Sequence, residues 1–107
     1  MILATLVLAA AMTLPPADFR SDGCTLWFDG NYYECCEAHD LDYWLGGSYA
    51  DRLVSDAKLA RCVARKGHPF MGWLMHEFVR PLGTCWIPWS HRWGAGWSWP
   101  QCGPDES

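Results

Sequence analysis

The chain has 107 residues, a length that predicts a single domain. Its formal net charge is −4, with 8 basic and 12 acidic side chains, which argues against a nucleic-acid-binding protein. The six cysteines are an even number, as in small exported proteins whose disulfides supplement a modest hydrophobic core. Their spacing alone does not choose among the possible pairings.

The first segment, residues 1–14, is mostly apolar and contains no charged side chain. It is shorter than the roughly 20 apolar residues that a membrane-spanning helix needs. Two prolines follow it, and its length suits the apolar region of an export signal, although no Lys or Arg precedes it. We therefore expect a signal peptide over residues 1–17, a domain over residues 18–107, and a protein located in the periplasm or outside the cell.

Two helices joined by a very short turn follow a glycine-containing loop at residues 21–30. Residues 31–45 lack Gly and Pro, which predicts a helix that Asp29 or Asn31 caps and that Gly46-Gly47 ends. The pattern Ser48-x-x-Asp51 resembles a capping box and predicts the start of a second helix over residues 48–66. Because the connection is so short, the two helices should lie antiparallel.

A third, shorter helix is expected over residues 69–80. It begins at His68-Pro69, since proline is favoured at the first helical position, and Pro81 and Gly83 should end it. Three apolar residues of this segment recur at helical spacing and are expected in the core: Phe70, Leu74 and Phe78.

The last segment, residues 84–107, is irregular and rich in tryptophan. It contains five of these residues: Trp86, Trp89, Trp93, Trp97 and Trp99. Tryptophan favours the membrane–water interface, so the segment could contact lipid. Alternatively, its rings pack over the helices as a compact wrap.

The antiparallel register places His39 opposite Asp56, because both lie at similar distances from the turn. A carboxylate that accepts a hydrogen bond from one ring nitrogen of a histidine leaves the other nitrogen available as a base. The same register lets a disulfide join Cys35 and Cys62. The pattern therefore predicts a His–Asp pair of the kind that activates water.

Asp40 lies about 100° round the helix from His39 and can point to the same cleft. A carboxylate beside backbone carbonyl groups is the environment that calcium prefers. The loop at residues 22–24 would supply those carbonyl groups if a bridge between Cys24 and Cys36 held it near Asp40.

The segment Cys35-Cys36-Glu37-Ala38-His39-Asp40-Leu41-Asp42-Tyr43 resembles the signature of the secreted phospholipases A2. That signature is two cysteines, two residues, His-Asp, one residue, Cys and Tyr. Asp42 replaces the usual third cysteine. The partner of that cysteine stands directly before the Asp that orients the histidine, and Ser55 stands there in this chain. Both halves of one disulfide are therefore missing together.

Two further positions carry the resemblance, which covers about residues 21–62. Cys62 lies six residues after Asp56, where the family has the partner of the first cysteine of the doublet. The segment Ser21-Asp22-Gly23-Cys24-Thr25 is similar to the loop of the bacterial branch, in which an Asp two residues before the loop cysteine binds calcium.

The resemblance implies an all-α, disulfide-stapled fold and calcium-dependent hydrolysis of the sn-2 ester of phospholipids at a membrane interface. By this likeness His39 deprotonates water, Asp56 orients His39, and Tyr43 hydrogen-bonds to Asp56. Calcium is then held by residues of the helix and of the loop: Asp40, Asp22 and Gly23. Together with the register, the likeness predicts disulfides Cys24–Cys36 and Cys35–Cys62, which leaves Cys85 to pair with Cys102.

Three other interpretations remain. The chain could be a catalytically silent member of this fold that binds lipid or a protein partner, or a structural envelope protein. A zinc site built on Cys36-x-x-His39 with other histidines (His68, His76 and His91) is less favoured in an exported chain with pairable cysteines.

Overall fold

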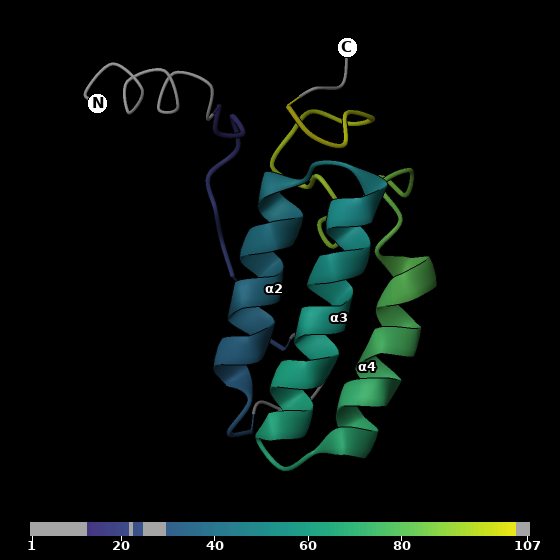
Figure 1. Ribbon diagram of the computed structural model, residues 1–107. Coiled ribbons are helices and arrows are strands. Elements are labelled where there is room, and N and C mark those ends of the chain that lie inside the picture. The colour runs from purple at the N-terminus through teal and green to yellow at the C-terminus, as the bar shows by residue number, and fades with distance from the viewer. Residues whose placement is uncertain (1–12, 22, 25–29, 105–107) are drawn as a thin grey trace, which may run out of the picture.

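The computed structural model describes residues 13–21, 23–24 and 30–104. Within this part of the chain there are three helices and no strand, namely α2 (Tyr33–Leu45), α3 (Tyr49–Arg65) and α4 (Pro69–Leu82) (Figure 1). The predicted all-α fold is confirmed. Most of the expected signal peptide, residues 1–12, lies outside the described residues. None of the helices in the described ranges combines the length and the apolar character needed to cross a lipid bilayer.

The start of α3 follows the predicted capping box. The Ser48 hydroxyl accepts a hydrogen bond from the backbone N–H of Asp51 at 3.1 Å, and the Asp51 carboxylate accepts one from the Ser48 N–H, also at 3.1 Å. Of the two residues expected to cap α2, Asp29 lies outside the described residues, and Asn31 does not cap the helix because its side chain bonds elsewhere. It donates to the Lys66 carbonyl at 3.0 Å and contacts a ring nitrogen of His68 at 2.8 Å. Asn31 therefore ties the start of α2 to the α3–α4 turn.

Helix α4 is longer than expected and presents a different face to the core. It continues through Pro81, whose φ suits a helix and whose missing N–H costs only one bond in the last turn. Phe70 and Phe78 are 69% and 46% exposed, so their predicted place in the core is wrong. The buried face is set by Gly72, where a Cβ atom would lie 2.5 Å from the Ala60 carbonyl oxygen, and by Met75. Close approach of α4 to α3 at this glycine turns the phenylalanines outward.

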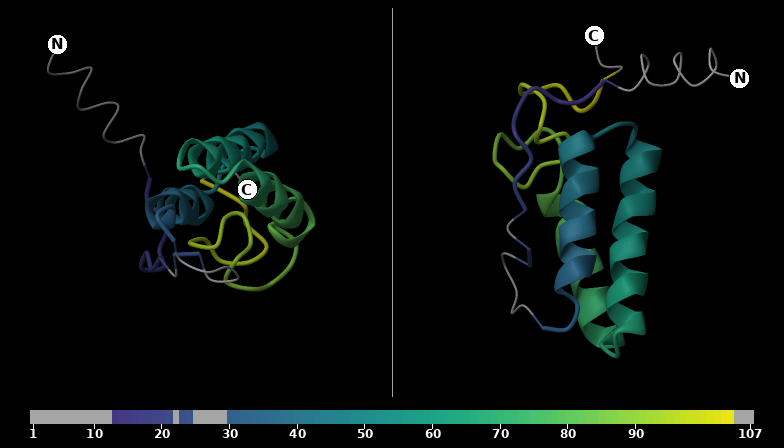
Figure 2. Two further views of the ribbon diagram at one scale, coloured as in Figure 1. Left: turned by 90° about the horizontal axis from the view of Figure 1, so that it is seen from below. Right: turned by 90° about the vertical axis from the view of Figure 1, so that its left-hand side faces the viewer.

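Helix α3 is the centre of the fold. Helices α2 and α4 both pack against it and make no close approach to each other (Figures 1 and 2). The core between them is small and contains three disulfide-bonded cysteines besides apolar side chains such as Leu59, Val63 and Met75. The space left between α2 and α4 is where a cavity forms.

The three disulfides are those that were expected. Cys24 pairs with Cys36, Cys35 with Cys62, and Cys85 with Cys102, at Cα–Cα distances of 5.2, 5.7 and 5.8 Å. The first ties the N-terminal loop to α2, and the second joins α2 to α3. Three disulfides indicate an oxidising compartment.

The C-terminal segment wraps over the ends of the helices nearest the α2–α3 turn. Three of its tryptophans donate indole N–H bonds to helix-end or turn carbonyls: Trp89 to Leu82 at 3.0 Å, Trp93 to Gly47 at 2.9 Å, and Trp97 to Leu45 at 2.7 Å. For these rings the wrap interpretation is correct. Trp86 and Trp99 instead remain 67% and 52% exposed.

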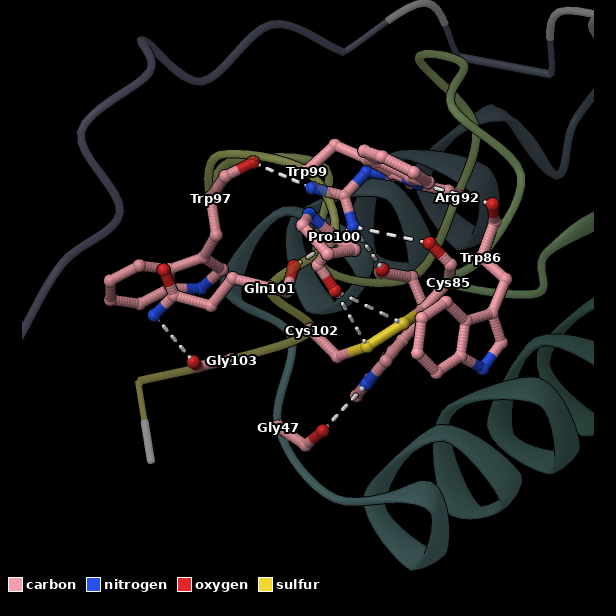
Figure 3. The surroundings of a disulfide bond; sticks show 11 residues. Gly47, Cys85, Trp86, Arg92, Trp97, Trp99, Pro100, Gln101, Cys102 and Gly103 are labelled. Atoms are coloured by element: carbon pink, nitrogen blue, oxygen red, sulfur yellow. Dashed lines mark hydrogen bonds between the residues drawn. A yellow bond between two sulfur atoms is a disulfide. The ribbon is translucent and has the colours of Figure 1, made fainter. Parts of the chain in front are cut away.

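The wrap is organised around one buried guanidinium group. Arg92 is 3% exposed and donates to backbone carbonyl groups along the segment, including those of Gln101 at 2.9 Å and Trp97 at 2.6 Å (Figure 3). Further bonds reach the carbonyls of Cys85 and Trp93. Because carbonyl dipoles rather than a carboxylate satisfy this cation, the segment holds its shape without regular secondary structure.

Candidate functional site

The centre of the candidate site is a histidine–aspartate pair that joins α2 to α3. His39 Nε2 lies 2.9 Å from Asp56 Oδ1, and the two residues are 9% and 0% exposed. This contact is the one expected from the helix register. Since the Asp56 carboxylate can only accept in this bond, Nε2 carries the hydrogen in the neutral imidazole. Nδ1 is then the nitrogen that can take a proton.

Tyr43 completes the support of the carboxylate. Its hydroxyl donates to Asp56 Oδ1 at 2.7 Å, one helical turn after His39. Burial, together with the nearby Asp56 charge, raises the pKa of the Tyr43 phenol well above its usual range. Tyr43 therefore remains a donor at any physiological pH, as the expected bond to Asp56 requires.

The second oxygen of Asp56 faces two arginines that sequence reasoning did not single out. Asp56 Oδ2 lies 3.8 Å from Arg52 Nε and 3.6 Å from Arg80 Nη1. Arg52 Nε also donates to the Tyr43 hydroxyl at 3.2 Å, and Arg80 contacts a ring nitrogen of His76 at 3.0 Å. Arg52 stands one turn before Asp56, which was a usable signal. The placement of Arg80 depends on how α4 packs, and no local pattern predicts it.

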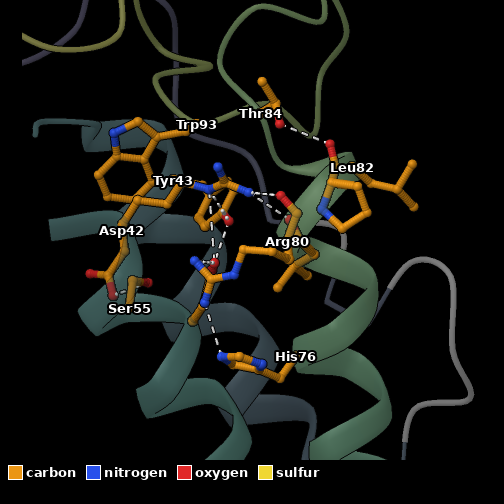
Figure 4. Close-up of polar contacts among 12 residues, drawn as sticks. Asp42, Tyr43, Ser55, His76, Arg80, Leu82, Thr84 and Trp93 are labelled. Carbon is orange, nitrogen blue, oxygen red and sulfur yellow. Dashed lines mark hydrogen bonds and ion pairs between the residues drawn. The ribbon is translucent and has the colours of Figure 1, made fainter. Parts of the chain in front are cut away.

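Asp42 and Ser55 occupy the two positions at which the resembled family has a disulfide. In the structure the Ser55 hydroxyl donates to Asp42 Oδ2 at 2.7 Å (Figure 4). The two positions are therefore neighbours across the α2–α3 interface. Asp42 lies three residues after His39, and Ser55 lies directly before Asp56. A hydrogen bond joins the helices where the family pattern has a covalent bond.

This contact leads to a prediction for the variant Asp42→Cys/Ser55→Cys. The two cysteines should form a fourth disulfide on folding, because the side chains already touch across the interface. For a loop of this size the bond should raise the free energy of unfolding by about 3 kcal/mol. Denaturant unfolding checks the gain, with Asp42→Ala/Ser55→Ala as the control that loses the hydrogen bond and gains no cross-link. If thiol titration of the folded double-cysteine variant detected two free thiols, the result would contradict the register of α2 against α3.

His39 opens onto a cavity of about 120 Å³. Its walls come from α2, α3 and α4, and also from the two irregular segments of the chain. The helices supply mainly apolar side chains, among them Leu59, Met75 and Phe78. Among the polar side chains at the cavity, the sequence analysis singled out His39, Asp40 and Tyr43 for this site and considered His91 only as a zinc ligand. It missed Arg20 and Ser90.

Two of the residues expected to bind calcium, Asp40 and Gly23, lie at one wall of this cavity. The Asp40 carboxylate accepts a hydrogen bond from the Ser21 hydroxyl at 3.0 Å, and the Ser21 oxygen accepts one from the Gly23 N–H at 3.2 Å. Gly23 has φ of +61°, and a side chain there would meet the Tyr33 ring. Asp22 lies outside the described residues. The Cys24–Cys36 bond thus holds the loop near α2, where the Asp40 carboxylate and the Ser21 hydroxyl offer oxygen atoms, the type of ligand that a hard cation takes.

The zinc hypothesis is wrong for the described residues. Cys36 is bonded to Cys24 and is not a thiolate, and His68 and His76 bond to Asn31 and Arg80. Within the described ranges, no three His, Cys, Asp or Glu side chains gather closely enough to hold a metal. The proposed calcium site would use one carboxylate and backbone oxygen atoms, so it would not require such a cluster of three side chains.

The geometry brings together His39, Asp56 and Tyr43 as one hydrogen-bonded group, with Asp40 and Gly23 beside it at the cavity wall. Comparisons of the chain with protein-family models, with curated proteins and with solved structures give no match.

Proposed function

We propose that this protein is a calcium-dependent, phospholipase A2-like hydrolase that cleaves the sn-2 ester of phospholipids. The observation that carries the proposal is the buried His39–Asp56 pair, at 2.9 Å, which opens onto a largely apolar cavity beside Asp40. A buried histidine with one nitrogen held by a carboxylate and the other directed to a cavity is arranged for general-base catalysis. The resemblance around residues 35–43 supplies the substrate class.

In the proposed reaction His39 Nδ1 takes a proton from a water molecule in the cavity, and that water attacks the ester carbonyl carbon. Asp56 keeps the ring in the tautomer that leaves Nδ1 as the acceptor, and its charge stabilises the imidazolium that forms. His39 then returns the proton to the leaving alcohol. Tyr43 keeps Asp56 in place through the 2.7 Å hydrogen bond.

Calcium would be held by Asp40 with the loop that contains Asp22 and Gly23. When bound, it would supply positive charge for the substrate phosphate and for the oxyanion of the attacked ester. The Ser21 hydroxyl, which bonds to Asp40, would orient the carboxylate toward the loop.

A lipid surface is the proposed partner. Phe78 lines the cavity and is 46% exposed, and two further aromatic side chains of α4, Phe70 and Trp73, are 69% and 56% exposed. Exposing large aromatic rings to water is energetically unfavourable, and such exposed rings often mark a surface that an apolar partner covers. On α4 these rings lie beside the cavity. The same exposed rings would serve a catalytically silent module that binds lipid or a protein partner, which is the second candidate function. The disulfides suit a periplasmic or extracellular location for either.

The release of fatty acid from mixed phospholipid vesicles tests the proposal. The protein should release sn-2 fatty acid in millimolar calcium and lose nearly all of this activity when a chelator is added. Vesicle sedimentation in the same samples separates the two candidates, because a silent module would bind vesicles without releasing fatty acid. Release that is equal with calcium and with chelator would remove the role proposed for Asp40.

A further inference from the structure

A second cavity of about 480 Å³ lies on the other side of Tyr43 from the first. The rings of Tyr43, which lines the first cavity, and of Trp93, which lines the second, meet edge to face at 4.9 Å and form part of the wall between them. The second cavity opens at the α2–α3 turn, between the start of α3 and the end of α4. Nothing in the proposed hydrolysis uses it.

The electrostatics of this cavity favour an anion. Arg52 and Arg80 both line it, and no described residue that lines it carries a carboxylate. The two guanidinium groups share a single carboxylate, Asp56, at 3.8 and 3.6 Å, so the pair carries one formal positive charge more than its carboxylate; Arg52 also donates to the backbone carbonyl groups of Val79 and Arg80. Arg52 is 5% exposed, yet its Nη1 makes no hydrogen bond to a described residue, since its bonds run through Nε and Nη2.

The position of the cavity at the start of α3 adds a second donor. Ser48, the N-cap residue, accepts a bond from Asp51 through its oxygen, and this leaves its hydroxyl hydrogen able to donate into the cavity. Arg52 Nη1 and the Ser48 hydroxyl are therefore two donors for one anionic group.

The rest of the wall is aromatic. Trp93 lies in the protein interior at 3% exposure, whereas Tyr49 and Trp86 are 62% and 67% exposed at the opening. Trp86 adjoins the Cys85–Cys102 disulfide, which also lines the cavity (Figure 3). Exposed rings beside a guanidinium group with one free donor nitrogen suit a molecule with an anionic head and an apolar chain.

We propose that this cavity is a binding site for an anionic amphiphile, namely a carboxylate with an apolar chain such as a fatty-acid anion. The carboxylate contacts Arg52 and Ser48, and the chain lies across Trp86 and Tyr49. Binding needs neither His39 nor calcium, so this proposal can be tested independently of the proposed hydrolysis.

Calorimetric titration of the full chain with laurate, below its micelle concentration and with chelator present, tests the site. Laurate should bind at one site, and Trp86→Ala should weaken binding about tenfold, because the ring that covers the chain is lost. Phe19→Ala is the matched control: Phe19 is 36% exposed, packs against Trp44 and does not line this cavity, so its loss should leave the affinity unchanged. Dodecanol, which has the same chain without the charge, should bind at least about tenfold more weakly than laurate.

Three results would overturn the proposal: no laurate binding, equal affinity of Trp86→Ala and wild type, or equal affinity for laurate and dodecanol. Equal affinity of Trp86→Ala and wild type would mean that laurate binds in the first cavity or on the α4 surface. If Trp86→Ala does not fold, as judged by its helical circular dichroism, Tyr49→Ala removes the facing ring, and the same tenfold weakening is expected.

Discussion

Replacing His39 by Gln should reduce the release of fatty acid by at least about 10²- to 10⁴-fold, the range typical of losing a general base. Glutamine is similar in bulk, and its amide can still donate to Asp56 Oδ1, where His39 Nε2 now lies at 2.9 Å. It cannot take a proton from water. The change therefore removes one chemical step and keeps the buried contact. Initial rates on phospholipid vesicles in calcium measure the effect.

Two comparisons make this result specific to the base. His68→Gln is the matched control, since His68 precedes α4 and does not line the first cavity, so the variant should keep wild-type rates. Calcium and vesicle binding by His39→Gln should match those of wild type, because neither uses the imidazole. Equal, substantial hydrolysis by wild type and His39→Gln would mean that the catalytic residues lie outside the His39–Asp56–Tyr43 group. Equal and negligible hydrolysis would favour the silent binding module.

The helical hairpin and its contacts could be predicted because they depend on local rules. A capping box at Ser48, glycines at the turn and a helix without Gly or Pro fix the register of α2 against α3. Once that register is fixed, the contact of His39 with Asp56 and the Cys35–Cys62 bond follow from counting residues. The neighbouring Asp42–Ser55 hydrogen bond is independent support for the same register, because the His–Asp and Cys–Cys pairs were not used to find it.

What could not be predicted depends on packing between distant segments. The outward turn of Phe70 and Phe78 follows from the close approach at Gly72, which no periodicity reveals. The approach of Arg80 to Asp56 depends on the same packing of α4. The wrap is specified by Arg92 and its bonds to backbone carbonyls, whose positions have no repeating pattern.

Replacing Asp40 by Lys should abolish calcium binding and, with it, most of the hydrolysis. The substitution removes the carboxylate proposed to hold the ion and puts an ammonium group in its place, which repels a divalent cation. The helices should persist, because Asp40 lies at the cavity wall and the Cys24–Cys36 and Cys35–Cys62 bonds do not involve it. Calorimetric titration with calcium measures binding, and fatty-acid release should fall to the level that wild type shows with chelator.

Glu37→Lys is the matched control for this charge reversal. Glu37 lies on the same helix three residues earlier, is exposed and does not line the cavity, so the variant changes the net charge equally. It should bind calcium and release fatty acid as wild type does. If Asp40→Lys and wild type gave the same calcium titration, the ion would bind elsewhere, and the bond to Ser21 would remain as a structural role of Asp40. If both lysine variants lost binding alike, the effect would come from the net charge of α2, and the loop at Gly23 would have no special part in it.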